Sequence, residues 1–238
     1  MDIQSTAAEG GVPTVAQLAI DHPGALSVFT RYNIDYCCGG HRSLEEACMR
    51  MGLDPVKIQS EIQEAPAGVQ VLRPETWGSA FLTDFIVQQH HAFVRKAIPE
   101  LEALLERVCE RHGQDTPALL PIRNAFMELA EELTLHMEKE ELILFPTIKR
   151  LENPEPDYHH PLGRMLQAPI AAMEDEHKAA GNLIRQIRLL SDNYTPPEFA
   201  CPTFRITFQR LREFDEDLMR HIHLENNILF ERFKQAWV

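Results

Sequence analysis

The sequence predicts an all-α protein in which an antiparallel four-helix bundle follows a small helical N-terminal domain. Three observations support this fold. Apolar residues recur at intervals of three and four over four long segments, which is the spacing of amphipathic helices. Short connections containing proline or glycine separate those segments, and short connections favour antiparallel neighbours. The later half of the bundle also repeats a pattern of the earlier half. We expect the N-terminal domain at residues 1–75 and the bundle at residues 76–238.

The N-terminal domain contains short amphipathic pieces rather than long helices. Ser43, followed three residues later by Glu46, is typical of a capping box that opens a helix. The Cys-Cys-Gly-Gly run at residues 37–40 is expected to form a loop before that helix. Proline and glycine between Pro66 and Gly78 then mark a linker to the bundle.

Each bundle helix is expected to bury one stripe of side chains. The four helices are predicted at residues 79–111, 117–151, 163–191 and 202–236, with ends uncertain by about 2–4 residues. The stripes include Val87, His91 and Val94 in the first helix, Leu133, His136, Glu140 and Ile143 in the second, Met173, His177 and Ala180 in the third, and Leu218, His221, Glu225 and Ile228 in the fourth.

Four histidines and two glutamates lie on these stripes at similar depths along the bundle, namely His91, His136, Glu140, His177, His221 and Glu225. A buried carboxylate is very costly unless it is paired or binds a metal ion. Histidine and a glutamate four residues later reach the same side of a helix. The sequence therefore predicts a centre of two metal ions, in which each glutamate bridges both ions and each histidine binds one. Imidazole with carboxylate suits iron, manganese or zinc.

An internal repeat supports this centre. Residues 135–145 match residues 220–230 at an offset of 85, and the histidines of the preceding helices are offset by 86. Other metal classes fit less well, because a ferritin-like site needs Glu-x-x-His on two helices and a zincin needs His-Glu-x-x-His. If the first helix were rotated, His90 would be the credible substitute for His91.

Composition narrows the functional classes. The net charge of −13 argues against nucleic acid as a partner. No apolar run approaches the roughly 20 residues of a membrane helix, and residues 1–11 lack the pattern of a signal peptide. We therefore expect a cytoplasmic protein without a membrane partner. Five scattered cysteines indicate reduced thiols. The oligomeric state stays open, with a homodimer as one option.

His-x-x-x-Glu on two helices, with one histidine on each of the others, resembles the hemerythrin-like bundle. Gly181 stands where the oxygen carrier hemerythrin has a further histidine, so the resemblance implies a more open site. The run Asp35-Tyr36-Cys37-Cys38-Gly39-Gly40, Glu176 before His177, the Pro196-Pro197…Cys201 loop and His221-x-x-Leu-Glu225-Asn226 are similar to the di-iron proteins that repair iron centres.

That resemblance implies two iron ions, held by the four histidines with the two glutamates as bridges. It also implies an access route lined by Glu132 and Glu176, and a role for Cys37 and Cys38 in thiol chemistry or iron transfer. The implied function is repair of iron-sulfur proteins damaged by nitric oxide or oxidants, through donated iron. Two alternatives use the same site, namely reduction of nitric oxide and sensing of nitric oxide or oxygen.

Overall fold

The computed structural model describes residues 12–22, 24–65, 72–152 and 162–235. The chain divides into two compact units, residues 1–73 and 74–238. Part of the expected linker, residues 66–71, and the turn between the second and third bundle helices, residues 153–161, lie outside the described residues. Within the described ranges, no helix combines the length and the apolar character that a membrane span needs.

The described part of the N-terminal unit contains four short helices, three of which begin at a side-chain cap. These helices are α1 (Val15–Asp21), α2 (Ala25–Arg31), α3 (Leu44–Met51) and α4 (Pro55–Glu64). Ser43 Oγ accepts a hydrogen bond of 3.2 Å from the backbone N–H of Glu46, so α3 opens where the sequence predicts it. Val15, Val28 and Phe29 are fully buried and form part of the small core.

The Cys-Cys-Gly-Gly loop at residues 37–40 joins α2 to α3 and packs closely on α1. The carbonyl of Gly40 accepts a hydrogen bond of 2.9 Å from the backbone N–H of Ala16. A Cβ atom at Gly40 would lie 2.6 Å from the carbonyl oxygen of Tyr36 and 2.8 Å from the Cβ of Ala16. Glycine is therefore required there, because any side chain would push the loop away from α1.

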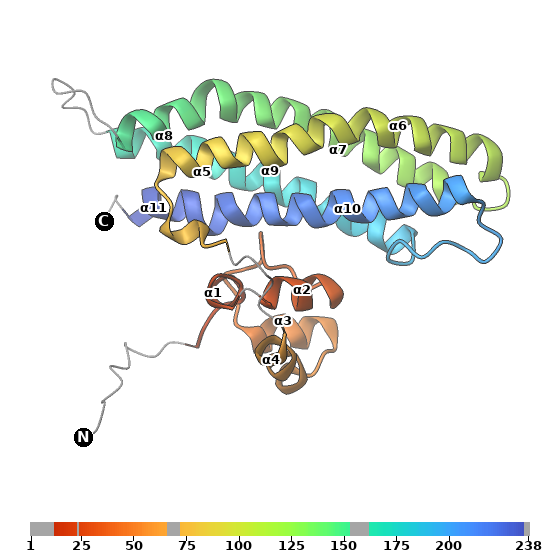
Figure 1. Cartoon of the computed structure of the whole chain (residues 1–238), viewed down its shortest axis with the longest axis horizontal. Coiled ribbons are helices and arrows are strands. Elements are labelled where there is room, and N and C mark those ends of the chain that lie inside the picture. The colour runs from red at the N-terminus through yellow and green to blue at the C-terminus, as the bar shows by residue number, and fades with distance from the viewer. Residues whose placement is uncertain (1–11, 23, 66–71, 153–161, 236–238) are drawn as a thin grey trace. The chain divides into compact units, whose positions relative to one another are not determined.

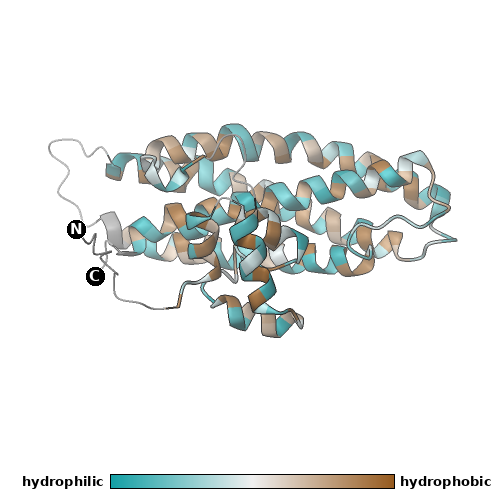
Figure 2. Cartoon of the chain, turned by 60° about the horizontal axis from the view of Figure 1, so that its bottom comes forward, coloured by the Kyte–Doolittle hydropathy of each residue, from teal (hydrophilic) through white to brown (hydrophobic). Residues whose placement is uncertain are grey.

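The second unit is the expected bundle of four long helices (Figure 1). A short 3₁₀ turn, η1 (Pro74–Thr76), precedes the bundle, and the first long helix consists of α5 (Ser79–Ile86), η2 (Val87–His91) and α6 (Ala92–His112). The second long helix consists of α7 (Leu119–Lys139), η3 (Glu140–Leu144) and α8 (Phe145–Glu152). The third is α9 (Leu162–Leu190), and the fourth consists of α10 (Pro202–Leu224), η4 (Glu225–Leu229) and α11 (Phe230–Gln235). Helix α7 packs against α6 and α9, and α10 packs against α6 and α9. Teal and brown alternate along these helices, as expected of amphipathic elements (Figure 2).

Three of the long helices contain a π-helical segment, η2, η3 or η4, whereas α9 is continuous α-helix. A π segment adds one residue to a turn and rotates the register of the residues beyond it. The expected stripe is wrong at Ile143 for this reason, because Ile143 is 62% exposed while Leu144 is buried. In the first helix Val87 is only half-buried, and Ile86 is fully buried instead.

One buried ion pair fixes the connection between α9 and α10. Asp215 accepts hydrogen bonds of 2.6 Å from Nε and Nη2 of Arg188 and one of 2.7 Å from the hydroxyl of Tyr194. Tyr194 ends a run of three residues with positive φ, at 47°, 53° and 61°. The pair therefore anchors a turn in the left-handed backbone region, which Asp192 and Asn193 tolerate but which is unfavourable for Tyr194.

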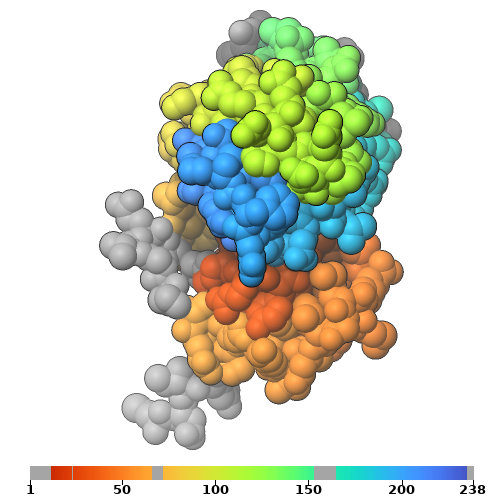
Figure 3. Space-filling view, turned by 90° about the vertical axis from the view of Figure 1, so that its right-hand side faces the viewer, coloured from red at the N-terminus to blue at the C-terminus, as the bar shows by residue number. Residues whose placement is uncertain are grey.

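Figure 3 looks onto the end of the bundle where α6 ends and α10 begins. There the Sγ atom of Cys201, at the N-cap of α10, lies 3.2 Å from Nε2 of His112. Cys48 is buried in the N-terminal unit, and Cys109 donates to the carbonyl of Leu119 at 3.4 Å. These three cysteines therefore occupy packing or connecting positions.

Candidate metal centre

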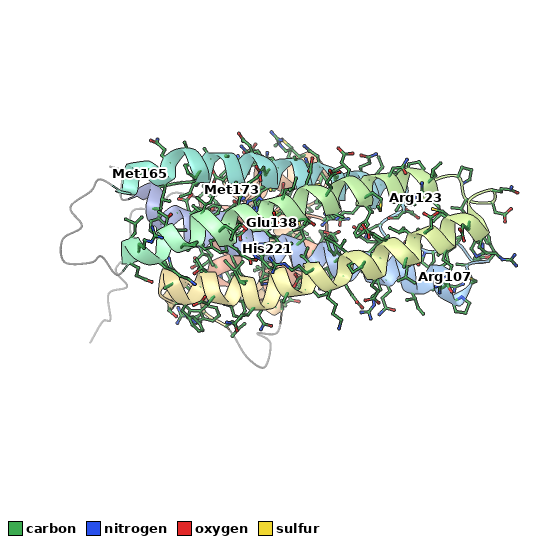
Figure 4. All side chains as sticks on the ribbon, turned by 90° about the horizontal axis from the view of Figure 1, so that it is seen from above. Arg107, Arg123, Glu138, Met165, Met173 and His221 are labelled. Atoms are coloured by element: carbon green, nitrogen blue, oxygen red, sulfur yellow. The ribbon has the colours of Figure 1, made fainter. Side chains whose placement is uncertain are left out.

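All four long helices contribute to a polar layer inside the bundle. The six side chains are His91 at the end of η2, His136 on α7, Glu140 at the start of η3, His177 on α9, His221 on α10 and Glu225 at the start of η4. Each of them is at most 3% exposed. In Figure 4, His221 lies in the middle part of the bundle, between Met165 toward one end and Arg107 toward the other.

The six side chains form two groups that share both glutamates. One group contains His91 and His221, the other contains His136 and His177, and each includes Glu140 and Glu225. Within a group, one donor atom from each residue lies within 4.8 Å of the others. The arrangement thus offers two neighbouring cation positions with two carboxylates between them.

The interatomic distances show how the donors converge. The Nε2 atoms of His91 and His221 lie 3.1 Å apart, and those of His136 and His177 lie 2.9 Å apart. Glu225 presents Oε1 to Nε2 of His221 at 2.9 Å and Oε2 to Nε2 of His177 at 3.1 Å. One carboxylate therefore faces both groups, with one oxygen for each.

The π segments position several of these residues. Glu140 and Glu225 each begin a π segment, and His91 ends one. Such segments occur frequently at functional sites. Because η2 rotates the first helix, both His90 and His91 are buried. Only His91 belongs to a ligand group, so His90 does not replace it.

Hydrogen bonds at Nδ1 orient three of the four ligand histidines. Glu141 lies 2.6 Å from Nδ1 of His91, Glu176 lies 2.8 Å from Nδ1 of His136, and Asn226 lies 2.7 Å from Nδ1 of His177. Such partners fix the tautomer of a ligand histidine and strengthen metal binding.

His221 differs from the other three. Its Nδ1 atom is buried and has no hydrogen-bond partner. The ring of His90 stacks on His221 instead, with centroids 5.6 Å apart and an interplanar angle of 10°. In the group of His136 and His177 both histidines are therefore oriented by a hydrogen bond at Nδ1, whereas in the group of His91 and His221 only His91 is.

Sequence reasoning missed Glu141 and His90 as supporting residues, but the internal repeat contained the signal. Glu141 and Asn226 each directly follow a shared glutamate, and each orients the histidine of the preceding helix. His223 is also buried, and it pairs through Nδ1 with Asn227 at 3.0 Å.

The buried histidines and glutamates of the centre shift one another's pKa values. Burial lowers the pKa of His91, but the nearby carboxylates of Glu140 and Glu225 outweigh burial and raise the pKa to about 10. Burial likewise opposes the rise at His136, where chiefly Glu140 raises the pKa to about 9. For His221 burial prevails and lowers the pKa. Two of the four histidines are thus poised to hold a proton without a metal.

The glutamates show the complementary effect. Burial raises the pKa of Glu225, but its close interactions with His221, His177 and His91 outweigh burial and hold that pKa well below its usual range. The pKa of Glu140 is also lowered, by His136 and His91 against the effects of burial and Glu225. Both carboxylates therefore stay ionised inside the bundle.

These residues fit two divalent cations. The carboxylate of the fully buried Glu140 and Oε2 of Glu225 face histidine nitrogens, at 3.4 Å and 3.1 Å respectively, that are not aligned to donate a hydrogen bond to them. Unpartnered buried carboxylate oxygens are costly and call for a cation. Two imidazole nitrogens with shared carboxylates are suitable donors for a transition metal. The site is therefore a di-metal site.

The expected access residues lie together at one side of this site. Glu132 and Glu176 line a pocket of about 250 Å³ with His136 and His177. Glu176 also accepts from Nζ of Lys139 at 2.6 Å. Burial and the charges of neighbouring glutamates raise the pKa of Glu132.

The expected thiol residues form a separate cluster in the N-terminal unit. Cys37, Cys38 and Asp35 place three donor atoms within 4.8 Å of one another. The Sγ atoms of the two cysteines lie 3.8 Å apart, and Oδ1 of Asp35 lies 3.3 Å from Sγ of Cys37. A hydrogen bond with Cys38, together with burial, raises the pKa of Cys37 well above its usual value.

Comparisons with known proteins cover both units. A family model described as the hemerythrin HHE cation binding domain matches residues 82–233, and a model named ScdA_N, a domain of unknown function, matches residues 12–66. Three curated relatives are each named iron-sulfur cluster repair protein YtfE. Those of Edwardsiella ictaluri and Musicola paradisiaca are 38% identical over 221 and 223 residues, and that of Yersinia pseudotuberculosis is 36% identical over 222. Each alignment covers 92% of this chain and 95% of the relative.

The two domain matches occur in the same order as the two units, and the helical bundle contains the buried cation site that the second model describes. On this evidence the chain belongs to the family of iron-sulfur cluster repair proteins that carry a hemerythrin-like di-metal bundle.

Proposed function

We propose that this protein repairs iron-sulfur clusters damaged by nitrosative or oxidative stress by donating iron from a di-iron centre. The observation that carries the proposal is the composition of the two ligand groups. Each combines two histidines with two shared glutamates. A few histidine and carboxylate ligands with positions left for other ligands are characteristic of non-haem iron(II) sites. Such a site can hold iron and can also release it.

The residues have distinct roles in this proposal. His91 and His221 would hold one iron, His136 and His177 would hold the other, and Glu140 and Glu225 would serve both positions. Iron supplies Lewis acidity and one-electron redox chemistry when bound. The protein's own contribution is to orient the histidines and to keep both carboxylates ionised in a buried layer.

The pocket beside His136 and His177 supports a route for release. Its two carboxylates, Glu132 and Glu176, would offer successive oxygen ligands to a departing cation. Lys139 also lines the pocket and pairs with Glu176, so the two carboxylates leave the pocket with a net negative charge, which concentrates cations. We therefore assign the exit of iron to this pocket.

Cys37 and Cys38 support a second stage of transfer. With Asp35 they provide two sulfur donors and one oxygen donor close together. The raised pKa of Cys37 keeps its thiol protonated in the absence of a cation, and a bound metal would displace that proton. Three ligands without a fourth suit transient rather than permanent binding. The recipient would be the damaged iron-sulfur protein.

The test is cluster reconstitution without oxygen. The iron-loaded protein is mixed with an apo iron-sulfur protein and sulfide, and cluster absorbance is followed together with the iron remaining in the bundle. Cluster formation that matches the iron lost supports donation. Slower transfer in the Cys37→Ala/Cys38→Ala variant, but not in a Cys109→Ala control, places the cysteine pair on the route. Iron that stays in the bundle would refute donation.

A second function is favoured by the side-by-side position of the two groups. Two nitric oxide molecules, two electrons and two protons give nitrous oxide and water, and two adjacent irons could bind both molecules. This alternative predicts nitrous oxide production that continues only while a reductant is supplied. A sensor of nitric oxide or oxygen would show neither turnover nor iron loss, only ligand-dependent binding of a partner. A cytoplasmic location is expected for all three functions.

A further inference from the structure

The internal repeat extends beyond the six ligands to the residues beside them. The repeat consists of two helix pairs. Glu132 lies four residues before His136 on α7, and Asp217 lies four residues before His221 on α10, so the two acidic residues differ by the same offset of 85. In the other helix of each pair, His90 directly precedes His91 and Glu176 directly precedes His177, with the offset of 86. The pair Glu132 and Glu176 on one side of the centre therefore corresponds to the pair Asp217 and His90 on the other.

On the first side, both positions hold carboxylates next to a cavity. Glu132 and Glu176 line the 250 Å³ pocket that reaches His136 and His177. Glu176 additionally fixes His136 through Nδ1. A cation that leaves this histidine group meets two negative side chains at once.

On the other side, the corresponding positions are paired with each other. Nδ1 of His90 lies 3.0 Å from both carboxylate oxygens of Asp217. The ring of His90 lies against His221 in a stacked arrangement and against Phe85 in an edge contact at 5.9 Å. His90 is only 7% exposed. The imidazole of His90 thus occupies the space next to His221, and both carboxylate oxygens of Asp217 pair with that imidazole.

The two sides of the centre differ in the donor atoms that they offer to a departing divalent cation. Stepwise movement from a buried site requires oxygen or nitrogen donors that replace one another along the way. Glu132 and Glu176 provide such donors, whereas His90 fills the equivalent position with a ring packed between Phe85 and His221. Lys139 also lines this pocket and pairs with Glu176 at 2.6 Å, so Glu132, whose charged neighbours are other glutamates, is the carboxylate that a leaving cation meets there without competing with an ammonium group.

We propose that His90 and Asp217 seal the side of the centre that contains His91 and His221, so that both metal ions enter and leave through the acidic pocket beside His136 and His177. The two groups of residues are related by the internal repeat, but metal ions would enter and leave on one side of the centre only. This inference deepens the proposed function, because it specifies the path that donated iron would take.

The experiment measures iron release to an excess of a coloured iron(II) chelator, without oxygen and without any recipient protein. Glu132→Gln is expected to slow the release of both irons by about tenfold or more, because both use the pocket. His90→Ala is expected to accelerate the release of one iron by a similar factor.

The variant with both Glu132→Gln and His90→Ala decides between sealing and simple loosening. If His90 seals a second route, one iron leaves the double variant fast and the other slowly. If His90→Ala only weakens the site, the remaining exit is still the altered pocket and both irons leave slowly. Slowing of only one iron by Glu132→Gln, or no acceleration by His90→Ala, would also refute the proposal.

Circular dichroism and iron content at equilibrium show that each variant is folded and loaded before the kinetics are compared. The chelator replaces the iron-sulfur recipient, so a protein that donates no iron to an apo cluster can still show one-sided release. Failure of the sealing proposal and failure of the donation proposal are therefore distinguishable.

Discussion

The Nε2 atoms of His136 and His177 lie 2.9 Å apart, although the two residues come from different helices. The Nδ1 atom of His136 faces a carboxylate oxygen of Glu176, and that of His177 faces the amide oxygen of Asn226. Both Nδ1 atoms must therefore carry hydrogen, and two neutral rings would point lone pairs at each other across this short distance. Only a cation between them, a proton or a metal ion, makes the arrangement favourable.

Metal binding should therefore release protons. The metal-free protein holds His91 and His136 with pKa values of about 10 and 9, so both are protonated at neutral pH. Metal ligands must be deprotonated, and loading both positions near pH 7 should release roughly two protons. Titration calorimetry in buffers of different ionisation enthalpy measures this number. A heat that does not depend on the buffer would contradict the assigned protonation states.

The metal-free protein should lose stability in alkali. The pKa values of His91 and His136 are higher in the folded state than the ordinary value of 6.5. Their contribution is therefore complete below about pH 6.5 and is lost as the pH rises through about 9 to 10. Urea unfolding between pH 7 and pH 10.5 should show a falling free energy of unfolding for the metal-free protein. Equal free energies across that range would show that the two protons do not stabilise the fold.

Substitution of a shared ligand should affect both metal positions, whereas substitution of an unshared ligand should affect one. Glu225 belongs to both groups and His177 to one. We expect Glu225→Ala to retain close to no metal and His177→Ala to retain about one ion per chain, since tight binding needs a nearly complete ligand set. Elemental analysis of protein purified with iron measures both. Glu138→Ala, an exposed change on the same helix as His136, should leave two ions bound. Equal metal content in Glu225→Ala and His177→Ala would contradict the sharing of Glu225.

The buried ion pair at the turn between α9 and α10 should matter for stability rather than for metal binding. Asp215→Ala leaves Arg188 without its partner and removes the acceptor for Tyr194. Loss of one member of a buried pair typically costs about 3–5 kcal/mol. Chemical denaturation measures this loss, with the adjacent Glu216→Ala as the control. A loss below about 1 kcal/mol, the scale of an exposed pair, would show that solvent replaces the interaction.

The predictability of the site differed among the helices for a physical reason. Helix α9 is continuous, and its predicted stripe, including Met173, His177 and Ala180, is buried as expected. A π segment can shift the buried stripe, because the hydrophobic pattern assumes a constant rotation per residue, although Ile228 inside η4 is buried as predicted. Ile143 illustrates such a shift, and the simultaneous burial of His90 and His91 illustrates it again.

The six residues that form the two groups could be selected from the sequence because their chemistry leaves few alternatives. Buried glutamates need a cation wherever the exact register lies, and the repeated spacing marks the same positions twice. The supporting contacts were harder to predict, because they depend on which Nδ1 atom faces which neighbouring helix. Spacing along the sequence does not contain that information, although the repeat links Glu141 with Asn226.

That link leads to the last prediction, which concerns the orientation of His177. Asn226 accepts from Nδ1 of His177 at 2.7 Å, whereas the next residue, Asn227, pairs with His223, which is not a ligand. Removal of such a supporting partner typically weakens metal binding by about 10–100-fold. Asn226→Ala should therefore lower the affinity of one of the two metal positions by that factor, while Asn227→Ala should leave both affinities unchanged. Competition with a chelator of known affinity measures each step. If both variants weaken binding equally, general loosening of η4 rather than the orientation of His177 controls the affinity.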